Sequence, residues 1–372
     1  MVEKRFDDLS RREFLKRSAA GGALFAFGPH IWIPRSMVGF AGDGNPHPNI
    51  SGLRVVGVQD EKMTGEQKPR STWLEQEPLV KADLVAANID RLACALAEEK
   101  EVKKAWEKIF VKPPKKAWGD VVVAIKTNHI AKQRTRSAVV AKMAHVLTDV
   151  IGVKGTNVHI YDACDGRRMS EETPFKGLPE GVELANRWGG YNIRATVPKP
   201  YKDGQQQARC LDHLVKGTVD ILIDLALCKG HDQRFGGITL SMKNHFGTFE
   251  PNPSHRSGGG ADYLIGINKT PEILGQIDPK TGKVLFPRQQ LCLIDALWSG
   301  RPGTPSGESI GQPNSLYMGV FGPVMDFVLA RSLCRDRLGW SVNEEVLGRF
   351  LSEFGLKEQD LPNEGKVIDA LA

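Results

Sequence analysis

The sequence has few cysteines, and none of them lies in the close pairs that local metal clusters need. It holds six cysteines in 372 residues, and no two are separated by only two residues. This spacing excludes a locally encoded zinc ribbon or ferredoxin-type iron–sulfur motif. Cys94, Cys228 and Cys292 lie in apolar runs, where a free thiol behaves as a small hydrophobe, so we expect buried thiols.

The sequence also lacks the common phosphate-binding loops and a strong excess of charge. No G-x-x-x-x-G-K-[ST] motif is present, and no G-x-G-x-x-G follows a predicted strand. The net charge is +6, of which residues 1–41 contribute half, and the remaining +3 is too small to indicate nucleic-acid binding. No apolar run reaches the ~20 residues that cross a bilayer, so we expect no transmembrane span in the mature chain.

The N-terminus does contain a specific signal, a twin-arginine export motif. Residues 10–16 read S-R-R-x-F-L-K, a short Gly/Ala-rich apolar stretch follows at 18–27, and residues 39–41 form a small-x-small cleavage site. We therefore predict a signal peptide at 1–41 that the twin-arginine translocase recognises, then a linker at 42–52. The folded protein would then be delivered to the periplasm. The alternatives are an uncleaved anchor or an ordinary amphipathic helix.

Beyond the linker, strand-like and helix-like segments alternate. Continuous apolar runs predict buried strands, and apolar residues at helical spacing predict helices. The predicted strands are 53–58, 121–125, 158–161, 219–227, 291–294 and 316–320, and the predicted helices are 81–100, 137–151 and the segment from Pro323 onward. This alternation indicates a single α/β domain at 53–372, with a mainly parallel sheet flanked by helices. Residues 162–207 are rich in Gly, Pro and charge and predict a smaller inserted subdomain.

Polar residues follow four of the predicted strands. In open α/β sheets, ligands bind beyond the carboxyl ends of the strands, where side chains from several strands share one edge. A single polar group at such a position is most simply a solvated loop residue, but four strand ends together favour a site. The residues concerned are Lys126, Asn128, Asp162, Lys229, His231 and Asp295.

Residues 229–247 are the richest of these segments. The pair Gly236–Gly237 lets the backbone approach a ligand closely, and a helix predicted at 238–246 would turn its N-terminus toward the pair as an anion site. Lys243 and Asn244 lie on that predicted helix. Because the helix is otherwise apolar, an unpaired ammonium would be costly to bury there. We therefore expect Lys243 to be buried beside a carboxylate or an anion pocket, the alternative being a solvated helix face.

Three histidines lie close together in the sequence. His231, His245 and His255 fall within 25 residues, and three imidazoles suit Zn²⁺, Ni²⁺ or Fe²⁺. Their spacing matches no named metal motif. The alternative to metal binding is a hydrogen bond to a backbone carbonyl or proton transfer.

Motifs spread over residues 53–338 are similar to those of a known family. They are Lys126-Thr127-Asn128, Lys229-x-His231 and residues 239–247, with Asp295 and Asp326 at positions where that family carries aspartates. Together they resemble the family called domain of unknown function 362. The resemblance implies the fold and a site at these residues, but no activity. Some members carry cysteine-rich iron–sulfur segments, which this chain lacks.

Two functions fit these residues. The first is an enzyme acting on a small anionic ligand, with Lys243, His231 and Asp295 as catalytic residues and His231 or His245 moving protons. A metal ion or a nucleotide-type cofactor at the site would explain export in the folded state. The second is a non-enzymatic periplasmic protein that binds a ligand or a redox partner. In both cases the predicted ligand-binding residues are Lys126, Asn128, Asp162, Lys229, Gly236, Gly237 and Asn244.

Export should depend on the arginine pair of the N-terminal motif. Replacing both residues, Arg11→Lys and Arg12→Lys, should leave folded protein in the cytoplasm, because every other defined position of the motif is already present. Cell fractionation of the wild type and the double variant measures this directly. Normal amounts of the double variant in the periplasm would show that export does not use this motif.

Overall fold

The computed structural model describes residues 46–66, 68, 70–162, 175–186, 188, 190–255 and 258–371. The predicted signal peptide and the first residues of the predicted linker lie outside the described residues. Within these residues, no helix is both long enough and apolar enough to cross a membrane.

A mixed sheet forms the centre of the described domain and confirms the predicted α/β fold. Within the described residues it has eight strands in the order β14-β1-β13-β12-β7-β2-β3-β4. All of them run in one direction except β13, which is antiparallel to both of its neighbours. The strands are β1 Val56–Gln59, β2 Val123–Lys126, β3 Val158–Asp162, β4 Glu183–Asn186, β7 Ile221–Leu227, β12 Gln289–Ala296, β13 Ser315–Gly319 and β14 Ile368–Asp369.

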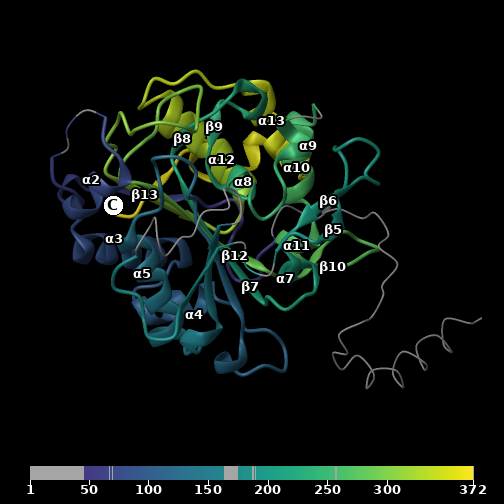
Figure 1. Cartoon of the computed structure of the whole chain (residues 1–372), viewed down its shortest axis with the longest axis horizontal. Helices are drawn as coiled ribbons and strands as arrows, with labels where there is room; N and C mark the ends of the chain where they lie inside the picture. The colour runs from purple at the N-terminus through teal and green to yellow at the C-terminus, as the bar shows by residue number, and fades with distance from the viewer. Residues whose placement is uncertain are drawn as a thin grey trace, which may run out of the picture. The chain divides into compact units, whose positions relative to one another are not determined.

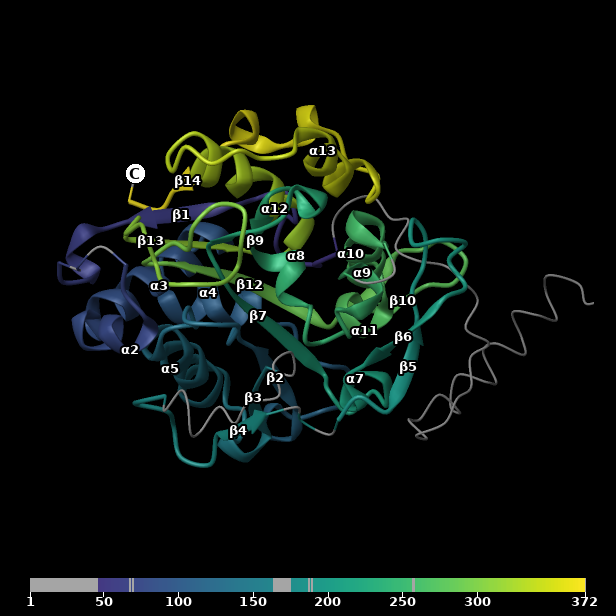
Figure 2. The same ribbon diagram turned by 45° about the horizontal axis from the view of Figure 1, so that its top comes forward.

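Helices cover both faces of the sheet, which is why its central strands are apolar on both sides (Figures 1 and 2). The helices α3 Ala82–Ala97, α4 Val102–Ile109 and α5 Ser137–His145 pack on one face, and α10 Gly260–Asn268, α12 Gly322–Leu329 and α13 Glu344–Ser352 on the other. Along β7, Ile223 and Leu225 point to the first face, and Leu222 and Ala226 to the second. This alternation places Asp224 on the second face of the sheet, the face that also carries the candidate site described below.

Shorter elements complete the domain. Three two-stranded antiparallel sheets lie outside the main sheet within the described residues: β5 Ile193–Thr196 with β6 Gln207–Cys210, β8 Lys229–Gly230 with β9 Ile238–Thr239, and β10 Gly275–Ile277 with β11 Val284–Pro287. The short helices are α2 Trp73–Gln76, α7 Asp212–Val215, α8 Ser241–Asn244, α9 Asn252–His255 and α11 Pro271–Leu274. Wider, π-helical turns at Val146–Ile151 and Ala330–Arg335 continue α5 and α12.

The stretch 162–207, predicted to be an inserted subdomain, divides in the structure. Its strand β4 pairs in parallel with β3 and so belongs to the main sheet. Its strand β5 instead forms a separate hairpin with β6. Residues 163–174 of this stretch lie outside the described residues. Within the described residues, the stretch is therefore divided between the edge of the main sheet and a separate hairpin.

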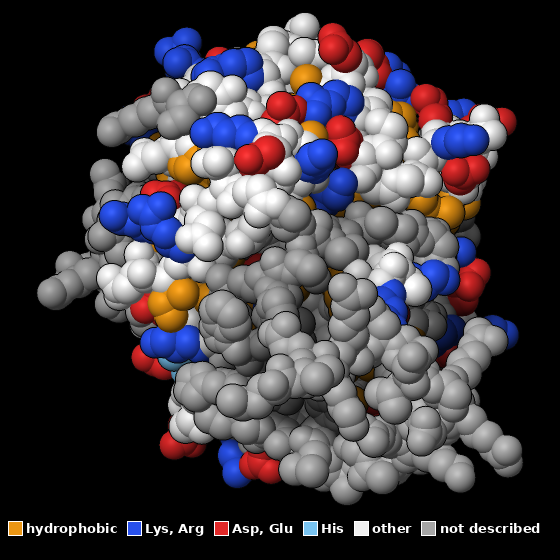
Figure 3. Space-filling view, turned by 90° about the vertical axis from the view of Figure 1, so that its right-hand side faces the viewer, with side chains coloured by type: hydrophobic (Ala, Val, Ile, Leu, Met, Phe, Trp, Pro, Cys, Tyr) orange, Lys and Arg blue, Asp and Glu red, His pale blue; other side chains and the backbone are white. Residues whose placement is uncertain are grey.

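The surface in Figure 3 shows mixed charge. On the described part of that face, Lys and Arg side chains are interspersed with Asp and Glu, and hydrophobic side chains are scattered singly. A large patch of one charge sign attracts nucleic acid to a protein surface. The described residues of this face form no such patch.

The predicted linker is anchored to the domain by a buried histidine. The side chain of His47 is 1% exposed. Its Nε2 donates to the carbonyl of Ile109 at 2.8 Å, and its Nδ1 accepts from the N–H groups of Asn49 at 3.2 Å and Ile50 at 3.1 Å. Only the neutral imidazole can make these bonds, and burial lowers the pKa of His47 to about 4.

This histidine should make folding stability depend on pH. Between pH 4 and 6.5 the unfolded chain protonates His47 and the folded chain does not, so its contribution to stability falls as the pH falls. In His47→Gln, the rise of the unfolding free energy with pH across this window should be smaller by up to about 1.4 kcal/mol per pH unit. Urea unfolding at several pH values measures both slopes. Equal slopes in the wild type and the variant would rule out a neutral His47.

Candidate functional site

A cavity of about 380 Å³ opens beyond the carboxyl ends of β2 and β7. Its volume lies in the range of small-molecule sites, ~300–1,000 Å³. The described residues that line it are Asn128, Ile130, Lys229, His231, Thr239, Lys243, Phe246, Pro251, His255 and Pro305. Five of these are residues singled out in the sequence, and the residues that follow β2 and β7 meet there. The other predicted residues do not line the cavity.

The segment predicted as a helix at 238–246 begins differently. Residues Ile238–Thr239 form strand β9, which pairs with β8 so that Thr239 lies opposite Lys229. The helix α8 begins only at Ser241 and has four residues. The apolar spacing of this segment therefore misled the prediction, because a tertiary pairing with β8 extends its first residues. Thr239 therefore lies on a strand and Lys243 on a short helix, and both line the cavity.

The N-terminus of α8 is not the predicted anion site. Asp326, on α12, is buried, and its carboxylate accepts from the N–H groups of Ser241 at 2.8 Å and Met242 at 3.0 Å. The protein's own carboxylate therefore occupies the position where a ligand anion was expected. Burial raises the pKa of Asp326 well above its ordinary value, while these two bonds favour the ionised form.

The predicted ligand-binding glycines serve the fold instead. Gly236 and Gly237 both have φ of +83°, a left-handed backbone that side chains rarely adopt. A Cβ on Gly237 would lie 2.8 Å from the carbonyl of Ser341, and one on Gly236 would lie 3.1 Å from Leu347. Neither glycine lines the cavity. The pair therefore lets the chain turn tightly against residues 341–350, and the cavity gives no support for the predicted ligand contact.

Lys243 is buried and faces the cavity, as expected from the sequence. Its side chain is 7% exposed. Its Nζ lies 3.9 Å from the centre of the Phe246 ring and 4.7 Å from that of Phe235, both within cation–π range. The two ring faces therefore stabilise the ammonium at the cavity wall.

His231 presents a fixed hydrogen-bond donor. Its Nδ1 accepts from the backbone N–H of Asp232 at 2.8 Å, which leaves the hydrogen of the neutral ring on Nε2. Burial, with the nearby charge of Lys243, lowers the pKa of His231 to about 2. The imidazole is therefore neutral near pH 7 and has no lone pair available to accept a proton. The predicted role of His231 in moving protons does not fit this arrangement.

Only two of the three predicted metal-binding histidines come together. The rings of His231 and His255 stack with centroids 5.9 Å apart, and burial lowers the pKa of His255 to about 4. His245 is fully buried elsewhere, with its Nε2 2.6 Å from Gln289 Oε1 and its Nδ1 3.2 Å from Thr248 Oγ1. Within the described residues, no group of three or more His, Cys, Asp or Glu side chains could hold a metal ion. The three-histidine metal site is therefore not formed by these residues.

Lys229 is the most deeply buried cation at the cavity wall. Its side chain is 1% exposed, and its Nζ donates to Asn128 Oδ1 at 2.7 Å and to the carbonyls of Ile130 at 2.9 Å and Gln133 at 2.7 Å. Burial lowers the pKa of Lys229. Three acceptors nevertheless match the three hydrogens of an ammonium, and a neutral amine would leave one acceptor facing a lone pair. The geometry therefore favours the charged form.

Asn128 and Asn244 link this lysine to a buried carboxylate that the sequence analysis missed. Asn128 Nδ2 donates to Asn244 Oδ1 at 3.0 Å, and Asn244 Nδ2 donates to Asp224 Oδ1 at 2.6 Å. Ser241 Oγ donates to the other oxygen of Asp224. Burial raises the pKa of Asp224 to about 7. A lone carboxylate inside the apolar run of β7 was the available signal for this residue.

Lys126 and Asp162 form a separate buried pair. The Lys126 Nζ lies 3.2 Å from Asp162 Oδ1, and the two side chains are 0% and 1% exposed. Lys126 also donates to the carbonyl of Thr127 at 2.6 Å, and Asp162 Oδ2 accepts from the N–H of His129 at 2.7 Å. Neither residue lines the cavity. Instead of binding a ligand as predicted, they hold the segment after β2 against the end of β3.

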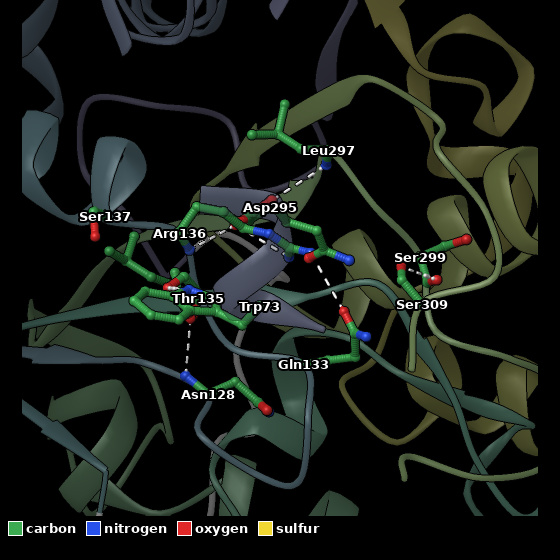
Figure 4. Close-up of polar contacts among 12 residues, drawn as sticks. Trp73, Asn128, Gln133, Thr135, Arg136, Ser137, Asp295, Leu297, Ser299 and Ser309 are labelled. Carbon is green, nitrogen blue, oxygen red and sulfur yellow. Dashed lines mark hydrogen bonds and ion pairs between the residues drawn. The ribbon is translucent and has the colours of Figure 1, made fainter. Parts of the chain in front are cut away.

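Asp295, predicted to be catalytic, is paired with Arg136 (Figure 4). Its Oδ2 accepts a hydrogen bond from the backbone N–H of Arg136 at 3.0 Å and lies 3.5 Å from the guanidinium Nη1 of the same residue. Its Oδ1 accepts from the backbone N–H of Leu297 at 3.2 Å. The guanidinium also stacks on Trp298, 5.1 Å from the ring centre. Asp295 does not reach the cavity. These contacts fix the start of α5 and the segment before it, and they offer no support for the predicted catalytic role.

Thr239 is a further cavity residue that sequence reasoning did not single out. The residue is 4% exposed, and its Oγ1 hydroxyl is buried without a hydrogen-bond partner in the part of the chain that the structure describes. Such a group costs about 1–3 kcal/mol when nothing bonds to it. Although Thr239 lines the cavity, its Oγ1 is itself buried, so a ligand oxygen in the cavity does not reach it.

Comparison with known proteins adds no family to this description. No family model matches the chain, and no curated protein matches it. The fold and the cavity define an α/β domain with a buried, basic site at the carboxyl edge of its sheet. The resemblance to domain of unknown function 362 stays a prediction from the motifs.

Removing the Lys229 ammonium should destabilise the fold. Lys229→Met leaves the oxygens of Asn128, Ile130 and Gln133 without their shared donor, and we expect a loss of roughly 2–4 kcal/mol in the free energy of unfolding. Lys132→Met is the matched control. Its side chain is 54% exposed and pairs with Glu308 at the surface, so its loss should stay within about 1 kcal/mol. Urea unfolding compares them, and equal losses would contradict a structural role for Lys229.

Proposed function

We propose that this chain binds a small anionic ligand in the cavity between β2, β7 and α8. The observation that carries the proposal is the meeting of two lysines, Lys229 and Lys243, with the neutral imidazole of His231 at one cavity. The described residues lining the cavity include two lysines and no Asp or Glu. A ligand that brings negative charge and oxygen acceptors would complement all of these groups.

The surrounding hydrogen bonds support binding by a rigid site. Lys229 holds Asn128 and the segment after it, and Asn244 ties Asn128 to α8. Groups that are fixed before the ligand arrives lose little side-chain entropy on binding. The cavity therefore has the preorganised support that a specific site needs.

The same bonds favour a binding protein over an acid–base enzyme. The predicted proton-transfer residues were His231 and His245, but the first is a fixed donor and the second is buried against Gln289. Asp295 is held by Arg136. We accordingly propose a ligand-binding role, performed in the periplasm if the twin-arginine motif directs export.

Binding should depend on the Lys243 charge. Isothermal titration at pH 7 with acetate, benzoate, inorganic phosphate and sulfate should find at least one anion that binds the wild type. Lys243→Met should weaken that binding about 10- to 100-fold, because a charge-assisted hydrogen bond contributes about 1.5–3 kcal/mol.

Lys202→Met provides the control. Lys202 also stands over an aromatic ring, with its Nζ 5.3 Å from the centre of Tyr201, but it does not line the cavity. Its replacement should leave the affinity unchanged. The proposal fails if none of the four anions binds, or if Lys243→Met binds as tightly as Lys202→Met.

A further inference from the structure

A chain of hydrogen bonds connects the cavity to a buried carboxylate. Lys229 Nζ donates to Asn128 Oδ1 at 2.7 Å, and Asn128 Nδ2 donates to Asn244 Oδ1 at 3.0 Å. Asn244 Nδ2 in turn donates to Asp224 Oδ1 at 2.6 Å. Lys229 and Asn128 line the cavity, while Asp224, at the other end of the chain, is 0% exposed. The chain therefore joins the proposed anion site to a group that can gain or lose a proton.

The two ends of this chain fix the direction of every bond in it. An ammonium can only donate and an ionised carboxylate can only accept, so each amide turns its NH2 group toward Asp224. Oδ1 of Asp224 therefore has to remain an acceptor. Its Oδ2 accepts from the Ser241 hydroxyl, and a hydroxyl can rotate to accept a hydrogen bond instead. A proton on Asp224 is consequently placed on Oδ2, where it leaves the chain to Lys229 intact.

The surroundings of Asp224 bring its protonation close to neutral pH. The titratable groups that face it are Lys126 on β2, Tyr161 on β3, Cys292 on β12 and Asp326 on α12. Burial raises the pKa of Tyr161 and of Cys292 well above their ordinary values, so both are neutral. Burial also raises the pKa of Asp224 to about 7, against the two hydrogen bonds that it accepts and the charge of Lys126. An added negative charge nearby would therefore favour the protonated carboxyl.

We propose that the cavity binds its anion together with a proton, which Asp224 takes up from solvent on Oδ2. This inference rests on the proposed anion site. An anion beside Lys229 offsets part of the positive charge that the ionised Asp224 faces through the two amides, and it adds a negative charge of its own. The only covalent bond that forms is the O–H bond of the carboxyl. Because coupling between two bound species is reciprocal, protonation of Asp224 strengthens anion binding by the same factor.

Isothermal titration of the full folded chain at pH 7, in buffers of different ionisation enthalpy, measures the protons taken up with each anion. The probes are acetate, benzoate, inorganic phosphate and sulfate. The wild type should take up roughly 0.2–0.5 more protons per anion than Asp224→Asn, in which an amide replaces the protonated carboxyl. Proton exchange by the anion itself cancels in this comparison.

The affinity should show the same coupling. Asp224→Asn should bind the anion about 3- to 10-fold more tightly than the wild type at pH 8, and the two should converge at pH 6, where the wild-type carboxyl is protonated. Asp90→Asn is the matched control. Asp90, on α3, pairs with Lys142 at 2.6 Å on the opposite face of the sheet, so removing its charge should change neither measurement.

The outcomes separate this inference from the proposed function. If an anion binds in a Lys243-dependent manner, but the wild type and Asp224→Asn take up equal numbers of protons, the anion site stands and the proton coupling is overturned. Weaker binding by Asp224→Asn at every pH also overturns it, because that result indicates a purely structural carboxylate. If Asp224→Asn does not fold, infrared difference spectra of the wild type decide: anion binding should produce a protonated-carboxyl band, and its absence overturns the coupling. If no anion binds, both proposals fall.

Discussion

The ammonium of Lys229 is buried at the end of β7, and the shape of the cavity depends on how that charge is held. A buried ammonium needs an acceptor for each hydrogen, and the three acceptors all come from the segment that follows β2. This segment must therefore close over the neighbouring strand. The closure brings Asn128 to the cavity wall and fixes it against Asn244 on α8. One charge thus joins two strand ends and a helix into a single rigid edge.

Buried carboxylates complete this edge, and each is used within the protein. Asp326 caps α8, Asp295 holds the backbone and guanidinium of Arg136, and Asp224 accepts from Asn244. Removing any partner would leave a charge or an acceptor unsatisfied in a region without water access, which is a large cost. These carboxylates therefore order the cavity but do not face it. Because these carboxylates are bonded within the fold, the described residues that line the cavity include two lysines and no Asp or Glu.

The central strands of the sheet could be predicted because buried parallel strands have continuous apolar sequences. The runs at 121–125, 219–227 and 291–294 became β2, β7 and β12, at the centre of the sheet. Prediction failed where pairing decides the structure. The strand β4 is short and lies at the edge, and β9 is a two-residue strand that exists only through its bonds to β8. Apolar spacing alone cannot distinguish β9 from the first turn of a helix.

For the site, residue types were predictable and their roles were not. The rule that strand ends share an edge located the cavity, but it could not tell which atoms would face a ligand. His231 shows why: its type permits a base, a metal ligand or a donor, and one backbone N–H, that of Asp232, selects the donor. Thr239 shows the converse, since the pairing of β9 with β8 leaves its hydroxyl buried without a partner among the described residues, which no sequence pattern indicated. The hydrogen bonds that the fold completes therefore decide which atoms are available at this edge, and residue types alone do not show them.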